Sequence, residues 1–329
     1  MRATVRGGME AGGFMNGSCR ICDEPATRTV GGYSFCDRHF DRSRHARRGG
    51  RDADIASIAL LVAFVVVLYL LDGLVQPQLD DVGLTVLGLI LALIPAIVWL
   101  AFFYRQDRFE PEPRTMVVGV FLLGLLVATA LANPVLDRVF DVGSWLSTSP
   151  MVHLAGAILV VGFLQEGLKY LTLRLSVYDS REFDERTDGI IYGSAIGLGF
   201  GTALNVAFVV ESGGVDLGTG AIRIVLTSLA HASFGGVIGY FLGRQKFETR
   251  PIWWMPAGVT LAAALNGSFF FLRNTVARGV IQDPLGVVSP WIGLVLAAIL
   301  AGAVTLVLAR LTRREIERAV ASSPSEVAG

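Results

Sequence analysis

The chain has 329 residues, of which 53% are hydrophobic and 17% are charged, and its basic and acidic side chains balance to zero net charge. Soluble domains carry about 25% charged residues, so this composition excludes an ordinary soluble protein and indicates a membrane protein. The absence of net positive charge also argues against nucleic acid as the main partner.

The N-terminal segment contains a pattern typical of zinc binding. Residues 1–18 are polar and glycine-rich, without the apolar core of a signal peptide, and are expected to be disordered. Residues 19–50 then contain two pairs of ligand-type side chains, each with two-residue spacing: Cys19 with Cys22, and Cys36 with His39. Such pairs surround one tetrahedral structural zinc ion. The alternative is that three cysteines and a histidine occur there without a shared ion.

A glycine pair between the two pairs of ligand residues suits a hairpin turn, so we expect a small treble-clef or ribbon-like module. With four protein ligands the zinc site is closed, and its role is expected to be structural or partner-binding. Thiols that bind metal also indicate a reducing compartment, which places this end of the chain in the cytoplasm.

The rest of the chain is dominated by apolar stretches. Residues 51–312 contain eight runs of about 20 residues, the length that crosses a bilayer as a helix. The runs are Ile55–Leu71, Val82–Tyr104, Met116–Phe140, Met151–Leu175, Gly189–Val210, Ala221–Gly243, Trp253–Leu272 and Pro290–Ala309. We therefore predict an all-α polytopic protein with about eight transmembrane helices embedded in the lipid bilayer, followed by a tail at residues 313–329.

Basic residues predict how these spans are oriented. They concentrate before the first span, in every second connection and after the last span, whereas the other connections hold far fewer. Because cytoplasmic loops carry an excess of Lys and Arg, both termini are predicted to be cytoplasmic in a multi-pass protein of the cell membrane. The connection from Tyr178 to Asp188 lies on this side and, being strongly charged, is expected to be solvated.

The fourth span contains the sequence Gln165-Glu166-Gly167-Leu168-Lys169 within an otherwise apolar run. Glu166 and Lys169 are three residues apart and therefore lie on one face of a helix. An ionised side chain in the middle of a membrane span costs roughly 2.5–3.5 kcal/mol on insertion scales, so the pair requires an explanation. It forms either an ion pair that locks helices together or a reactive or metal-binding centre.

Two later spans carry glycine every four residues. The rows are Gly189, Gly193, Gly197 and Gly201 in one span, and Gly235, Gly239 and Gly243 in the next. Small residues at this spacing allow two helix backbones to approach closely. The first row continues to Asn205 and the second is preceded by His231, while Asn266 adds an amide in the seventh span. The predicted interior therefore holds Gln165, Glu166, Lys169, Asn205, His231 and Asn266.

Four segments together resemble the PrsW-type intramembrane metalloproteases. They are Pro95 through Pro113, which ends in Asp107-Arg108-Phe109-Glu110-Pro111-Glu112-Pro113, then Gln165–Lys169, Asp188 through Asn205, and His231 through Gly243. The resemblance covers about residues 85–275 and implies a helical membrane protease related to the prenyl-protein-processing and bacteriocin-processing enzymes. It further implies a catalytic divalent ion held between glutamate and histidine, which activates a water to attack a peptide carbonyl of a membrane protein substrate.

Carried over to this chain, the resemblance makes Glu166 a general base or metal ligand, Lys169 its charge partner and His231 a metal ligand. The chain departs from the family pattern at three positions. Gln165 stands where the family has the first of two glutamates, Leu204 where it has a glutamate, and Asn266 where it often has a histidine. Neutral amides are poor zinc ligands, and a catalytic zinc usually has three protein ligands.

Three functions remain open from the sequence. The first is a metalloprotease centred on Glu166 and His231, with Lys169, Asn205, Asn266 and Gln165 as further candidate site residues. The second is a catalytically inactive relative that binds membrane-protein clients and signals through its zinc module. The third is a small-solute transporter that uses Glu166 and Lys169 as a relay, although the broken helices in matched repeats that are typical of transporters are not found here.

Overall fold

The computed structural model describes residues 19, 24–30, 33–38, 40, 59–60, 62–64, 66–68, 70, 80–104, 112–214, 219–275 and 290–321. The chain forms two compact units, one made of Met1–Gly49 with Arg314–Gly329 and the other of Gly50–Arg313.

The first unit contains the predicted hairpin. Strand β1 (Arg28–Val30) pairs antiparallel with β2 (Tyr33–Phe35), with Val30 paired to Tyr33 and Arg28 to Phe35. Cys19 and Cys36, one from each proposed pair of ligands, are both buried. Cys22 and His39 lie outside the described residues, so the four-ligand zinc site stays a prediction.

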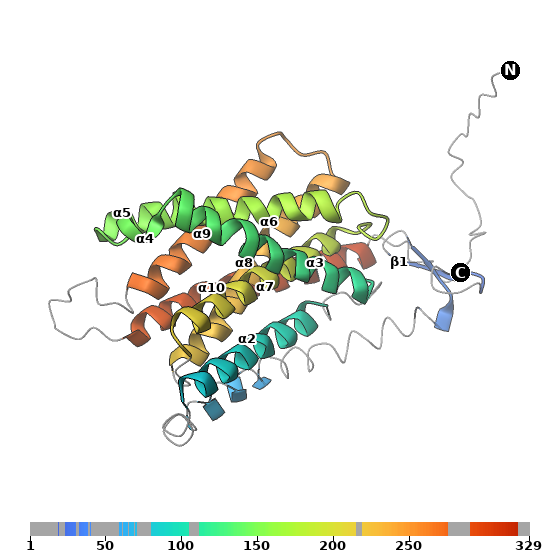
Figure 1. The fold of residues 1–329 in the computed structure, drawn as a ribbon. Helices are drawn as coiled ribbons and strands as arrows, with labels where there is room; N and C mark the ends of the chain where they lie inside the picture. The colour runs from blue at the N-terminus through green and yellow to red at the C-terminus, as the bar shows by residue number, and fades with distance from the viewer. Residues whose placement is uncertain are drawn as a thin grey trace. The chain divides into compact units, whose positions relative to one another are not determined.

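The second unit is a helical membrane domain (Figure 1). Among the described residues, seven helical stretches are long and apolar enough to cross a membrane, and they correspond to the second to eighth predicted spans. Of the first predicted span, Ile55–Leu71, the structure describes residues 59–60, 62–64, 66–68 and 70, and these are helical. The helices, with three π-helical segments, are α2 (Asp81–Tyr104), α3 (Arg114–Val127), η2 (Ala128–Ala132), η3 (Val135–Val139), α4 (Val142–Trp145), α5 (Pro150–Gly156), η4 (Ala157–Gly162), α6 (Phe163–Ser176), α7 (Arg186–Glu211), α8 (Thr219–Phe247), α9 (Trp254–Thr275) and α10 (Pro290–Ala321).

Helices α7 and α8 form the centre of this domain. Their membrane-spanning windows are 72% and 78% buried, against 22% to 39% in the other five spans. The outer helices expose apolar side chains instead, such as Ile97, Leu171 and Leu175. An apolar surface of this kind is suited to lipid contact.

The two glycine rows, whose spacing predicted close approach of helix backbones, pack against each other. A Cβ atom on Gly193 would overlap the carbonyl oxygen of Gly235, and one on Gly239 would overlap the carbonyl oxygen of Gly189. The same relation holds between Gly197 and the backbone of His231. Helices α7 and α8 are therefore antiparallel and in backbone contact, which leaves no room for a larger residue along this line.

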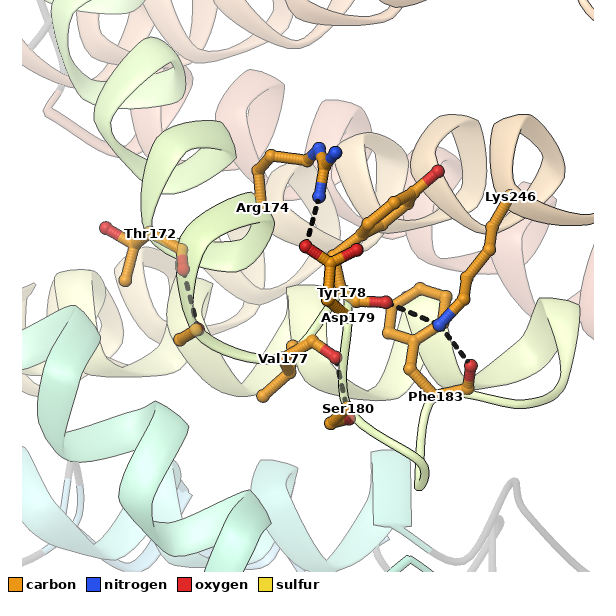
Figure 2. Close-up of polar contacts among 9 residues, drawn as sticks. Thr172, Arg174, Val177, Tyr178, Asp179, Ser180, Phe183 and Lys246 are labelled. Atoms are coloured by element: carbon orange, nitrogen blue, oxygen red, sulfur yellow. Dashed lines mark hydrogen bonds and ion pairs between the residues drawn. The ribbon is translucent and has the colours of Figure 1, made fainter.

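The connection between α6 and α7 is more ordered than the sequence suggested. Lys246 of α8 donates hydrogen bonds from Nζ to the carbonyl oxygens of Tyr178 and Phe183, and Arg174 pairs with Asp179 at 3.1 Å (Figure 2). The prediction of a solvated loop is wrong for Phe183, whose ring is only 1% exposed and stacks on Tyr192. Burial of this ring ties the loop to the helical domain.

Candidate active site

Glu166 and Lys169 form a buried ion pair within α6. Lys169 donates from Nζ to Glu166 Oε1 at 2.6 Å, and the two side chains are 0% and 1% exposed. The helical spacing predicted this contact, because residues three apart lie on the same face. Each charge is compensated by the other, which a pair inside a low-dielectric bundle requires.

Helix α8 brings His231 to the same ammonium. Lys169 Nζ lies 3.0 Å from His231 Nδ1, and it also lies 5.2 Å from the centre of the Phe200 ring on α7. Because an ammonium group only donates hydrogen bonds, Nδ1 is the acceptor and the neutral imidazole carries its proton on Nε2. The Lys169 ammonium is thus surrounded by a carboxylate, an imidazole nitrogen and an aromatic face.

Helix α9 contributes Asn266 to this group. Its Nδ2 donates to Gln165 Oε1 at 2.9 Å and to Glu166 Oε1 at 2.8 Å. Gln165 and Asn266 are two of the three positions at which the chain departs from the family pattern, and they are hydrogen-bonded to each other. The amide of Asn266 acts here as a donor to the glutamate.

Close packing between α9 and the segment before α6 fixes this contact. A Cβ on Gly162 would overlap the carbonyl oxygen of Ala263, and one on Gly267 would overlap the backbone of Ile158. Backbone contact at these two glycines leaves little freedom for the distance between Glu166 and Asn266. The π-helical segment η4, which directly precedes α6, belongs to the same interface; π-helical turns are frequent at functional sites.

The second oxygen of Glu166 is buried and has no hydrogen-bond partner among the described residues. One carboxylate oxygen is therefore held by two donors, Lys169 Nζ and Asn266 Nδ2, while the other is left without one. A buried acceptor without a partner is costly in a protein interior, and such a group is a candidate for contact with a water or a ligand.

Asn205 lies on the glycine-row face but does not join this group. Its Nδ2 donates to the Ile224 carbonyl at 3.0 Å and to Ser228 Oγ at 3.1 Å, so it links α7 to α8. The structure therefore brings together Gln165, Glu166, Lys169, His231 and Asn266 of the six predicted interior residues. Asn205 supports the helix pair that carries His231.

Sequence reasoning did not single out Arg273, which lies near this centre. The side chain is 8% exposed, and Nη1 donates to Thr227 Oγ1 at 2.9 Å, one helical turn from His231. The available signal was its position seven residues after Asn266, which places both side chains on one face of α9. Arg273 therefore adds a buried positive charge one helical turn from His231, toward the N-terminal end of α8.

A second buried carboxylate lies at the start of α3. Glu112 is 5% exposed, accepts a hydrogen bond from Tyr192 of α7 and is hydrogen-bonded to Asp188. Burial raises the pKa of Glu112 from 4.5 to about 7, against the opposing effect of the hydrogen bonds from Tyr192 and Asp188. Glu112 therefore keeps its proton to a higher pH than an exposed glutamate and releases it as the pH rises to about 7.

The donor set at Glu166 fits a divalent ion poorly. The described part of the chain has no group of three or more His, Cys, Asp and Glu side chains placed to bind one ion. Glu166 and His231 are both bonded to the Lys169 ammonium, and zinc would have to approach each donor to about 2 Å. An ion bridging them would meet the ammonium, so the predicted metal does not fit while Lys169 keeps this position.

Comparison with known proteins shows which family the chain matches. The model of the PrsW family intramembrane metalloproteases matches residues 112–299. The protease PrsW of Bacillus subtilis (strain 168) is 30% identical over 207 residues, which cover 61% of this chain and 90% of that protein. The protease PrsW of Geobacillus kaustophilus (strain HTA426) is 32% identical over 157 residues, or 47% of this chain and 65% of that protein. No solved structure matches the chain.

Proposed function

Since the chain belongs to the PrsW family of intramembrane metalloproteases, we propose that it hydrolyses a peptide bond of a membrane protein, with Glu166 as the general base. The observation that carries this proposal is the asymmetry of the Glu166 carboxylate. Oε1 is held by Lys169 and Asn266, and Oε2 is buried without a partner. A fixed carboxylate with one oxygen left to accept a proton is what a general base requires.

In the proposed reaction, Oε2 of Glu166 takes a proton from a water whose oxygen attacks the peptide carbonyl carbon. The new C–O bond gives a tetrahedral intermediate, and its collapse breaks the C–N bond as Glu166 returns the proton to the leaving nitrogen. His231, protonated on Nε2, is suited to donate a hydrogen bond to the developing oxyanion. Lys169 positions Glu166 and His231 by contacting both.

A comparison of cellular N-termini tests this proposal without knowledge of the substrate. New N-terminal peptides of membrane proteins are quantified in cells that express the wild-type chain, the Glu166→Gln variant or the Glu182→Gln variant. Glu182 is exposed in the α6–α7 connection and provides the same chemical change away from the centre. We expect peptides that appear with wild type and Glu182→Gln and disappear with Glu166→Gln. Identical peptide sets in all three strains would overturn the proposal.

The same experiment separates the protease from an inactive membrane-protein-binding relative. If no peptide depends on Glu166 but clients co-purify with the chain, binding without cleavage is the better account. Such a scaffold would depend on its cytoplasmic module, so Cys19→Ser would remove its cellular effect while Glu166→Gln would not.

We also propose that Cys19, Cys22, Cys36 and His39 bind a structural zinc ion on the cytoplasmic side of the membrane. The burial of Cys19 and Cys36 and the hairpin between them support this assignment. Loss of about one zinc per chain in Cys36→Ser, measured on purified protein, is the expected result. Protease digestion of sealed vesicles of known orientation tests the predicted location of both termini.

A further inference from the structure

The Lys169 ammonium occupies the position that the family resemblance assigns to a divalent ion. It lies 2.6 Å from Glu166 Oε1 and 3.0 Å from His231 Nδ1, so the glutamate and the histidine proposed as metal ligands both contact the same nitrogen. The third neighbour, the Phe200 ring at 5.2 Å, presents the negative face of its π-system to this cation. The side chain is 1% exposed, so the cation is part of the packed interior.

Charge balance makes Lys169 and a divalent ion alternatives. One ammonium neutralises one carboxylate, and the imidazole that accepts a hydrogen bond from it is neutral, so the centre has no net charge. A divalent ion added to this group would leave two uncompensated positive charges inside an apolar bundle, close to the buried Arg273. Two further ligand positions, Gln165 and Asn266, are neutral amides that satisfy each other.

We infer that Lys169 is the resident cation of this centre. The wild-type chain then binds no divalent ion at Glu166 and His231, and removal of the ammonium opens these two groups to a metal. This inference deepens the proposed function and rests on it for the role of Glu166. Lys169 is a positioning residue in this account: it orients Glu166 Oε1 and fixes the tautomer of His231.

The test compares the metal content of four full-length chains purified in detergent and equilibrated with zinc: wild type, His231→Ala, Lys169→Met, and Lys169→Met combined with His231→Ala. All four share residues 1–50, so any zinc bound by the N-terminal module cancels in the comparison. Met replaces the lysine with an uncharged side chain of similar length and leaves Glu166 without its counter-charge.

We expect wild type and His231→Ala to hold equal amounts of zinc. We expect Lys169→Met to gain about one ion per chain and the double variant to lose it again. Loss of one ion on His231→Ala alone would overturn the inference, because it would show a metal bound beside Lys169. Equal metal content in a folded Lys169→Met chain would also overturn it. If Lys169→Met fails to fold, the comparison of wild type with His231→Ala still decides the question, because it leaves Lys169 in place.

Cleavage measured with a chelator separates this inference from the proposed function. Activity that depends on Glu166 and is unchanged by chelation supports both. Activity that depends on Glu166 and is lost on chelation, then restored by zinc in a Cys36→Ser chain, would overturn the inference and leave Glu166 as the centre of a protease. Lys169→Arg keeps a cation, so it should retain the wild-type metal content.

Discussion

Two buried glutamates in this chain show how neighbours decide what a carboxylate can do. Glu166 in α6 is paired with an ammonium and an amide donor, and its second oxygen has no partner. Glu112 before α3 is paired with a phenol and with another carboxyl group, and burial raises its pKa to about 7. In the proposed function Glu166 uses its second oxygen to accept a proton, whereas Glu112 binds a proton below about pH 7 and links the segment before α3 to Tyr192 of α7.

The largest expected effect distinguishes the two glutamates by activity. Glu166→Gln removes the proton acceptor and should lower the cleavage rate by about 10²–10⁴-fold, the usual contribution of general acid–base catalysis. Glu112→Gln preserves both hydrogen bonds of Glu112 and should leave the rate nearly unchanged. Rates are measured on a substrate identified by the N-terminal peptide comparison. Equal losses in the two variants would contradict the division of roles.

The next effect is a dependence of stability on pH that comes from Glu112. Because the pKa of Glu112 is raised from 4.5 to about 7, the folded chain binds the proton more tightly than the unfolded chain. Its contribution to stability is therefore complete below pH 4.5 and is lost as pH rises to about 7. The change is about 3 kcal/mol at most, since each unit of pKa corresponds to about 1.4 kcal/mol.

Thermal unfolding of the detergent-solubilised chain between pH 4.5 and 8 measures this effect. Glu112→Gln should flatten the dependence on pH, whereas Glu211→Gln, an exposed control at the end of α7 whose charge does not affect the pKa of Glu112, should retain it. A wild-type chain whose stability rises with pH across this range would show that Glu112 is not held protonated by the fold.

A smaller effect tests the contact between α7 and α8. These two helices carry Tyr192, the partner of Glu112, and His231, which contacts Lys169 beside Glu166. Gly193→Ala places a methyl group against the Gly235 carbonyl, and overpacking of this kind typically costs about 1–3 kcal/mol. Gly302→Ala in α10 is the matched control, because its Cβ meets nothing within 4 Å. The midpoint of thermal unfolding should fall for Gly193→Ala only. A similar midpoint for both variants would argue against backbone contact between α7 and α8.

The smallest effect compares two buried asparagines. Asn266→Ala removes a donor to Glu166 Oε1 and should lower cleavage about 10-fold, as expected for one hydrogen bond to a charged group. Asn205→Ala removes bonds to Ile224 and Ser228, so it should reduce stability with little change in rate per folded molecule. The two variants are compared at equal amounts of folded protein, and a larger rate loss in Asn205→Ala would reverse the assignment.

These regions differ in how far the sequence predicts them. Hydropathy located the spans because the bilayer imposes a length and a polarity on each helix. The four-residue glycine spacing predicted close helix contacts at both rows, and the structure shows that the two rows contact each other. The convergence of Glu166, Lys169, His231 and Asn266 followed from the small number of polar residues in apolar helices, each of which requires a partner in the interior.

Other features depend on which neighbouring helix a side chain faces and on contacts between residues far apart in the chain. A sequence pattern does not specify either. The sequence places Asn205 in the centre because it continues the glycine row. That row faces α8, so Asn205 reaches Ile224 and Ser228 of α8 and not Glu166 of α6. The π-helical segments arise from local packing, and the bond between Glu112 and Tyr192 joins residues 80 apart in the chain. The burial of Phe183 goes with hydrogen bonds from Lys246 of α8 to the carbonyl oxygens of Tyr178 and Phe183.

The hydrogen bond between Gln165 and Asn266 has a consequence for how substitutions at these two positions combine. A glutamate at position 165 alone would place a second carboxylate beside Glu166. A histidine at position 266 alone would replace the amide that donates to both Gln165 Oε1 and Glu166 Oε1. Each single replacement is expected to be harmful while the pair together is tolerated, since residues in direct contact do not behave additively. A chain designed to carry the glutamate and the histidine that the family resemblance expects at these two positions should therefore need both exchanges at once.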